Sequence, residues 1–267
     1  MSENTQAALM PEKPVLATPR QTPLKEFFSR TAVKNKIAEL VGKNSAVFAT
    51  SVMQIAQNNS MLATATPESI FSAACMAATL NLPINATLGF AHIVPYRNRK
   101  LNRVEAQFQI GWKGYVQLAQ RTGQFKRIAV TSVHEGQLIK KNPLTGYEFD
   151  FDSGWENEVI GFAAYFQLLN GFEATLYMSK DEMINHAKRY SQSFQKQYGV
   201  WFDNFDSMAH KTVIKLLLSR FAPLSIDSPI HKAIESDSAI LGDSGALYYP
   251  DNSQEFDAIE ADGQLSE

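Results

Sequence analysis

The sequence predicts an α+β fold, with a mostly antiparallel sheet and a β-hairpin flanked by N-terminal helices and a long C-terminal helix. Three observations predict it. Apolar residues recur at helical spacing from Leu24 to about Leu80, segments between 88 and 177 alternate with the period of strands, and residues 203–220 are helical again. Helices and strands that are segregated along a chain favour α+β over a parallel βαβ sheet.

The core is expected to begin with helices. Pro23 suits the first turn of a helical region that continues to Val41. A second helix is expected over 44–58, and Thr66-Pro67-Glu68 begins a third that reaches about Leu80.

A strand, a basic turn, a second strand and a short helix follow over residues 88–123. Further strands are expected over 125–133, 147–151, 159–168 and 172–177, and Asn170-Gly171 predicts a tight hairpin. Ser179 and Glu182 predict a capping box for a helix to about Tyr190. Residues 191–199 are expected to be a loop, and Pro223 to stop the helix of residues 203–220.

The net charge of −2 hides a partition along the chain. Residues 235–267 contain nine acids and no Lys or Arg, whereas residues 25–234 carry a charge of +7. The chain is therefore predicted to have a flexible arm over 1–22, a basic core over 23–234 and a disordered acidic tail over 235–267. The tail is interpreted as a partner-binding or self-competing segment, with a solubilising tail as the alternative.

Other classes of protein are disfavoured by composition. No apolar run reaches the length of a membrane span, and the N-terminus lacks the order of a signal peptide. The single cysteine, Cys75, lies in an apolar helical run and is interpreted as a core residue rather than a nucleophile. These features indicate a cytoplasmic protein without an intrachain disulfide.

Two basic constellations suggest a polyanion ligand. The first is the turn with Arg97, Arg99, Lys100 and Arg103, whose like charges repel unless an anion lies against them. The polar face of the next strand adds Gln107 and Gln109, and the polar stripe of the short helix adds Lys113 and Arg121. The alternative is an ordinary solvated hairpin and helix, and for the two glutamines alone that alternative is preferred.

The second constellation is the helix 203–220. Lys211 and Lys215, four residues apart, repel by roughly 0.2–0.5 kcal/mol, and a bound phosphate would reverse that sign. His210 and Arg220, on the same helix, are further candidate DNA contacts, and Lys188 and Arg189 are second-tier candidates. Trp201 and Phe202 are better explained as packing residues than as base-stacking platforms.

The ordered set of motifs resembles the RecT family of phage-type single-strand annealing recombinases. Its members show an extended segment, a variable turn, a polar strand and a Gly-aromatic-basic-Gly helix. The matching segments here are 88–96, 104–110, Gly111-Trp112-Lys113-Gly114, Arg121-Thr122-Gly123, Gly199-Val200-Trp201 and 208–212. Asn81 stands where the family has glycine, and His210 where a lysine is usual.

The resemblance implies ATP-independent annealing of complementary DNA strands by oligomeric rings or helical filaments, with no catalytic residue, metal or cofactor. It implies binding to single-stranded DNA, to the annealed duplex intermediate and to further copies of the chain. Through the acidic tail it implies a phage exonuclease or a host single-strand binding protein as partner.

Two rival functions are kept. A passive single-strand coating protein would share the basic groove. A metal-dependent nuclease could use Asp181, Glu182 and His186, or Asp150, Asp152 and Glu156, although a helix cap and a solvated strand end explain these residues better. No phosphate-binding loop of the GxxxxGK[ST] type is present, which argues against an ATP-driven motor.

Overall fold

The computed structural model describes residues 23–85, 87–98, 101–195, 197, 199–225, 228–238, 240–241 and 247–248. The predicted arm over 1–22 and most of the predicted acidic tail lie outside these residues. The predicted boundary at residue 235 remains a prediction, but the structure places Glu235 and Ser236 in a helix and Asp237 and Ser238 against the core.

Four helices form the N-terminal part of the fold: α1 (Leu24–Ser29), α2 (Thr31–Val41), α3 (Ser45–Asn58) and α4 (Pro67–Thr79). Short 3₁₀ turns occupy Gly42–Asn44 and Leu62–Thr64. Ser69 of α4 ties this layer to the strands that follow, because its Oγ accepts a hydrogen bond from the backbone N–H of Ala106 at 2.8 Å. The predicted helical start of the core is confirmed.

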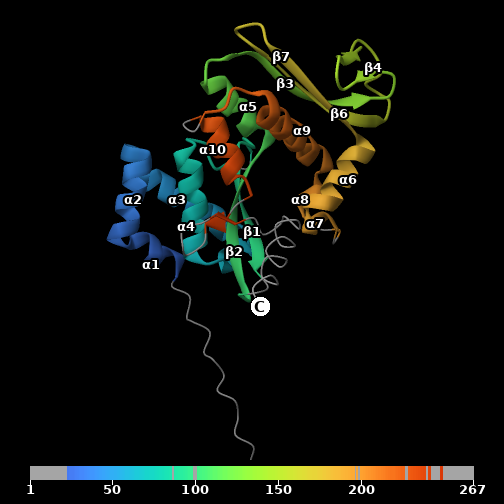
Figure 1. Cartoon of the computed structure of the whole chain (residues 1–267). Coiled ribbons are helices and arrows are strands. Elements are labelled where there is room, and N and C mark those ends of the chain that lie inside the picture. Colours follow the sequence, from blue (N-terminus) through green and yellow to red (C-terminus); the bar gives the residue numbers. More distant parts are fainter. Residues whose placement is uncertain are drawn as a thin grey trace, which may run out of the picture.

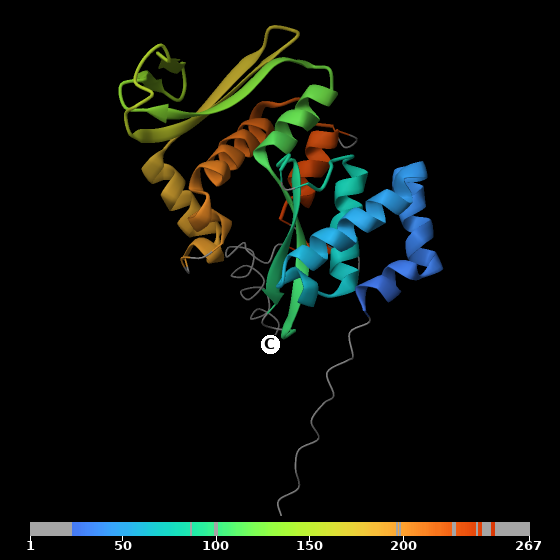
Figure 2. The same cartoon turned by 180° about the vertical axis from the view of Figure 1, so that it is seen from behind.

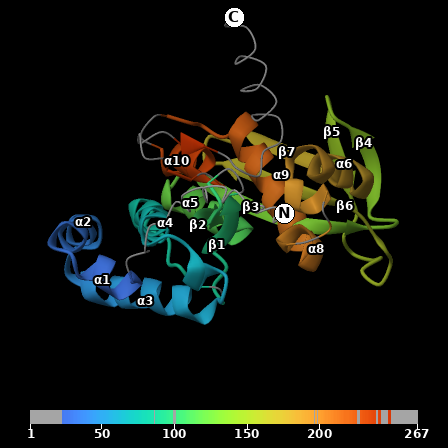
Figure 3. The same cartoon turned by 90° about the horizontal axis from the view of Figure 1, so that it is seen from below.

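The hairpin of β1 (Ala91–Asn98) and β2 (Arg103–Ile110) forms the middle of the molecule. Its antiparallel register pairs Ile93 with Phe108. Figures 1 and 3 show the hairpin between α4 on one side and α8 on the other. Strand β2 is buried from Glu105 to Phe108 and at Ile110, and it is half-buried at Arg103, Val104 and Gln109.

Helix α5 (Trp112–Arg121) packs tightly against the start of the hairpin. A Cβ atom at Gly114 would overlap the carbonyl oxygen of Phe90, so the second glycine of the Gly-Trp-Lys-Gly motif is required by close backbone approach. Asn81 has a φ of 50°, a conformation that favours Gly and that Asn tolerates better than most residues. This explains why Asn can replace the family's glycine there.

A second layer is the antiparallel sheet with the strand order β3-β6-β7. It consists of β3 (Phe125–His134), β6 (Val159–Leu168) and β7 (Glu173–Ser179), and the small hairpin of β4 (Leu138–Asn142) and β5 (Gly146–Phe149) lies at its end (Figure 1). The expected strands and the Asn170-Gly171 hairpin are present, whereas β4 was not predicted.

The C-terminal helices cover this sheet and reach back to the hairpin (Figure 2). They are α6 (Lys180–Tyr190), α7 (Gln192–Gln195), α8 (Val200–Asp203), α9 (Phe205–Phe221) and α10 (Pro229–Ser236). The segment predicted as a loop thus contains α7, and α10 was not predicted. A last short pair, β8 (Ile240–Leu241) and β9 (Leu247–Tyr248), packs on α4 through β8.

One large apolar core joins the two layers. Phe108 of β2, Tyr115 of α5, Phe162 of β6 and Leu217 of α9 are fully buried in it. The α+β class, the antiparallel pairing, the flanking N-terminal helices and the long late helix are confirmed. The described strands form several small antiparallel sheets rather than one large one.

Candidate nucleic-acid interface

A trough lies between the hairpin on one side and α6, α8 and α9 on the other. Two adjoining cavities of about 480 and 450 Å³ form it, and both are lined by Gln109, Met208 and Lys211. The first continues along β1 to the start of α5, and the second continues to the ends of α6 and α10. The base of the hairpin and the late helix therefore face the same space.

The centre of the trough is a three-membered ion cluster. Asp237 accepts hydrogen bonds from Lys211 Nζ at 2.8 Å and from Lys215 Nζ at 2.9 Å. Its Oδ1 also accepts from the backbone N–H of Ile110 at 2.9 Å, which attaches the cluster to the end of β2. The two lysines predicted to hold a phosphate are thus held by a carboxylate of the chain itself.

The two lysines differ in exposure. The side chain of Lys211 is 8% exposed, whereas that of Lys215 is 30% exposed. The interpretation of Lys211 as a direct phosphate contact does not fit its burial beside Asp237. Lys215 keeps part of its surface open to the trough, and the cluster carries one net positive charge.

Asp237 is ionised despite its burial. Burial alone would raise the pKa of its carboxyl group, but the positive charges of Lys211 and Lys215 and the hydrogen bond from Ile110 hold this pKa well below its ordinary value. The cluster is therefore a buried, fully ionic contact that ties α9, the end of α10 and β2 together.

Two described cations of the hairpin turn, Arg97 and Arg103, differ in their surroundings. Arg97 is exposed near the tip, and Arg99 and Lys100 lie outside the described residues. Arg103 instead forms an ion pair with the buried Glu105, at 2.6 Å. The pair carries no net charge, but 38% of the Arg103 side chain stays exposed, so the phosphate contact of Arg103 remains a prediction.

The predicted open polar face of β2 is wrong for two of its three residues. Glu105 and Gln107 are buried, and the Gln107 side-chain amide donates to the carbonyl oxygen of Ser238. The segment after α10 crosses β2 and covers this face, which sequence periodicity could not indicate. Gln109 is half-buried, donates to Gln107 Oε1 at 3.0 Å and still lines the trough.

Helix α5 presents one predicted cation to the trough and one elsewhere. Lys113 is exposed, lies over the Trp112 ring at 5.6 Å and lines the first cavity. Arg121, at the far end of the helix, donates to the carbonyl oxygens of Leu80 and Asn81 at 3.2 and 2.8 Å. Arg121 therefore ties the end of α5 to the end of α4, because Leu80 and Asn81 directly follow the last residue of α4.

His210 does not face the trough. Its ring packs against Trp112 and Phe162 at 5.8 and 5.5 Å, and its Nε2 lies 3.1 Å from Ser132 Oγ. Burial lowers the pKa of this histidine, while Asp206 partly raises it. A neutral, packed imidazole is not a phosphate ligand, so the prediction for His210 does not fit the structure.

The ends of α6 and α9 bring more positive charge to the second cavity. His186 and Tyr190 line it, and the charges of Arg189 and Arg220 act on His186, whose pKa is lowered first by burial and then by these two groups. Both arginines are exposed. Lys188 is exposed on another side of α6, where it lines a separate groove with Phe202.

The two aromatics before α9 differ. Trp201 is 8% exposed and packs against Phe194 and Phe205, as a packing residue should. Phe202 is 63% exposed. The prediction that both are packing residues therefore fits Trp201 and not Phe202.

Glu182, one of the residues considered for a nuclease site, caps a helix and forms an ion pair. The Glu182 carboxylate accepts from the backbone N–H of Ser179 at 2.7 Å and pairs with Lys141 at 3.2 Å, so the predicted capping box is confirmed. Within the described ranges, no three His, Cys, Asp or Glu side chains are grouped so that they could hold a metal ion.

Asp237 is the residue that sequence reasoning missed. Nothing in its local sequence distinguishes it from the other acids of the predicted tail. The repulsion between Lys211 and Lys215 is an indirect signal that a negative group lies nearby. The sequence does not show whether that group is a bound phosphate or a carboxylate of the chain.

Comparison with known proteins decides the family. The RecT family model matches residues 46–255. The chain belongs to the RecT family. Membership in this family implies single-strand annealing in DNA recombination, binding to single-stranded DNA and self-association. Its members are annealing proteins rather than conventional enzymes.

Two relatives match this RecT-family chain. The uncharacterized protein YqaK of Bacillus subtilis (strain 168) is 43% identical over 205 residues, which cover 76% of this chain and 69% of that protein. Protein RecT of Escherichia coli (strain K12) is 28% identical over 179 residues, covering 63% of this chain and 62% of that protein. No described helix is both long and apolar enough to span a bilayer.

Proposed function

We propose that this chain binds single-stranded DNA along the trough and anneals it to a complementary strand without ATP. The observation that carries the proposal is the shared lining of the trough, in which Gln109, Lys113 and Lys215 come from the hairpin, α5 and α9. These elements also hold the motifs that identify the family. Arg97, Arg189 and Arg220 extend the positive surface toward its ends.

Binding in this way is dominated by phosphate neutralisation. Lysine and arginine displace counterions from the DNA backbone, so the affinity falls steeply as salt rises. The side-chain amide of Gln109 hydrogen-bonds sugar or phosphate without reading sequence. Base edges are left open to a second strand, and the reaction breaks no bond.

Annealing is accelerated because the bound strand is held extended and its charge is partly neutralised. Neighbouring protomers in a ring or filament supply successive segments of the trough. The acidic segment that follows the core binds an exonuclease or a single-strand binding protein.

The decisive experiment mixes two complementary fluorescent oligonucleotides with the protein in the absence of any nucleotide cofactor. We expect faster pairing than without protein, and slower pairing by a Lys113→Ala/Lys215→Ala double variant than by wild type. Lys140→Ala, on an exposed position of β4, serves as the matched control and leaves the rate unchanged. Pairing slowed by the wild-type protein would identify a passive coating protein instead.

A further inference from the structure

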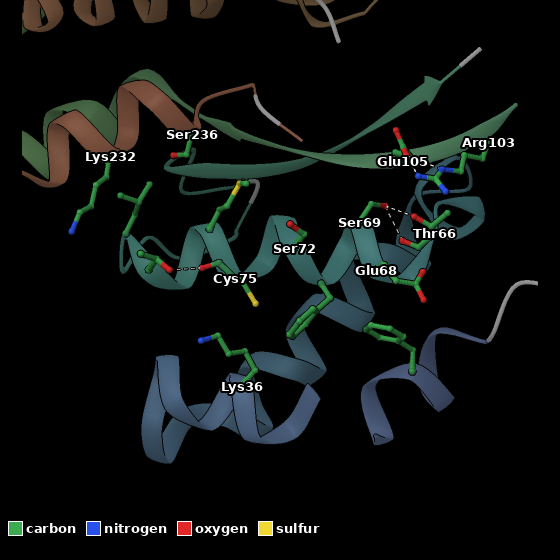
Figure 4. Close-up of a pocket in the computed structure, with 15 residues that line it drawn as sticks. Lys36, Thr66, Glu68, Ser69, Ser72, Cys75, Arg103, Glu105, Lys232 and Ser236 are labelled. Carbon is green, nitrogen blue, oxygen red and sulfur yellow. Dashed lines mark hydrogen bonds and ion pairs between the residues drawn. The ribbon is translucent and has the colours of Figure 1, made fainter. Parts of the chain in front are cut away.

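A second groove, of about 750 Å³, lies outside the trough (Figure 4). Helix α4 forms its floor with apolar side chains that include Phe71 and Met76, Leu80 follows at the C-cap of this helix, and Phe27 of α1 closes one side. Lys36 of α2 and Lys232 of α10 lie at one end.

The groove and the trough lie on different sides of α10. Lys232 and Ser236 of α10 line the groove, whereas Ile234 and the following Asp237 line the trough. A segment in the groove is therefore separated from the trough by α10.

Two hydroxyl groups among the described lining residues, one on α4 and one on α10, lack hydrogen-bond partners. The Oγ atoms of Ser72 and Ser236 are buried and have no hydrogen-bond partner within the part of the chain that the structure describes. Both serines line the groove beside its apolar floor, so an occupant with donors and acceptors as well as apolar groups fits it. An extended or helical peptide supplies both beside its apolar side chains.

We propose that residues 255–260 of the same chain, Glu-Phe-Asp-Ala-Ile-Glu, occupy this groove. Phe256 and Ile259 match its apolar floor, and the acids beside them match the positive charges of Lys36 and Lys232. The spacing of three places the two apolar side chains on one side of a helical turn.

The route of the chain supports this occupant. Strand β8 packs on α4, the floor of the groove, and its partner β9 ends at Tyr248. Seven residue steps separate Tyr248 from Glu255, and a chain of that length spans up to about 24 Å. Docking in the groove holds this acidic segment away from the positive trough.

Cys75 provides a direct test, because it is the single cysteine of the chain and lines the groove. Its rate of alkylation by N-ethylmaleimide, followed by mass spectrometry on the full chain without DNA, reports whether the groove is covered. We expect Phe256→Asp/Ile259→Asp to raise this rate at least tenfold, on the order expected when two apolar anchors are lost. Leu265→Asp, an apolar tail position outside the segment, is the matched control and leaves the rate at the wild-type value.

A second pair of variants probes the charged end. Lys232→Glu should raise the rate of Cys75 alkylation, whereas Lys34→Glu, an exposed lysine that does not line the groove, should not. An unchanged rate in both Phe256→Asp/Ile259→Asp and Lys232→Glu would overturn the proposal. Faster alkylation on deletion of residues 1–22, with no effect of the tail variants, would assign the groove to the N-terminal arm. Neither readout depends on DNA binding.

Discussion

Lys211 Nζ lies 2.8 Å from Asp237 Oδ1, in a contact that is almost fully closed to solvent. Lys211 comes from α9, the helix with two lysines four residues apart, and Asp237 comes from the start of the acidic segment 235–267. Their pairing means that the positive potential of the trough is set partly from within the chain. It also means that the fold depends on an acid that the sequence alone predicts to lie in a disordered tail.

The first prediction concerns stability. Asp237→Asn leaves Lys211 buried without its counter-charge, and breaking a buried pair in this way costs about 3–5 kcal/mol of unfolding free energy. Urea unfolding would measure the loss. Glu235→Gln, at an acid two residues away that is 58% exposed, should change stability by less than about 0.5 kcal/mol. Equal stability of Asp237→Asn and Glu235→Gln would show that the cluster contributes nothing.

A second prediction follows from the depressed pKa of Asp237. The unfolded chain takes up a proton near the ordinary aspartate pKa of about 3.9, whereas the folded chain takes it up only at lower pH. The contribution of Asp237 to stability is therefore complete above that pH and is lost as the pH falls below it. The difference in unfolding free energy between wild type and Asp237→Asn should shrink between about pH 5 and pH 3. Parallel pH profiles would contradict this.

The third prediction separates the two lysines of α9. Lys215→Ala should weaken binding to single-stranded DNA of every sequence and lower the slope of log K against log salt by roughly 0.7. Lys211→Ala should mainly lower the unfolding free energy, because it removes a buried partner of Asp237. Fluorescence anisotropy over a salt series and urea unfolding on the same variants give the two readouts. Identical DNA-binding losses with unchanged stability would return Lys211 to the role of a phosphate ligand.

A fourth prediction compares two arginines of the hairpin. Arg97→Ala should reduce affinity for single-stranded DNA and its salt dependence, because Arg97 is exposed. Arg103→Ala should leave the salt slope unchanged, because its guanidinium is engaged by Glu105, and should lower stability instead. Anisotropy titrations at two salt concentrations check both variants. A larger loss of affinity for Arg103→Ala than for Arg97→Ala would reverse the assignment.

The fifth prediction concerns which residues of the acidic segment the fold needs for its stability. A chain that ends at Tyr248 keeps Asp237 and the β8–β9 pair, and its melting temperature should stay near that of the full chain. A chain that ends at Ile234 loses the ion cluster and should melt at a clearly lower temperature. Calorimetry on the two chains distinguishes a tail that starts at residue 235 from one that starts after the core contacts.

Local sequence signals were sufficient for most of the fold. The alternation in 159–168, the Asn170-Gly171 turn and the Ser179–Glu182 capping box depend on neighbours along the chain, so their geometry was readable. The same holds for the amphipathic stripe of α5 and for the glycines that its motif requires. Short elements without a repeat, such as β4 and α10, gave no comparable signal.

The sequence by itself determined the α+β class, the separation of charge and the family, because these depend on composition, periodicity and ordered motifs. Only the tertiary structure decided which cations are available to a ligand. Arg103, Arg121 and Lys211 look as basic in sequence as Arg97, Lys113 and Lys215, but Glu105, two carbonyl oxygens of the chain around α4 and Asp237 engage the first three. Lys215 also pairs with Asp237, but 30% of its side chain stays exposed. A charge is neutralised by whatever lies within a few ångströms of it, and that neighbour can be tens of residues away along the chain.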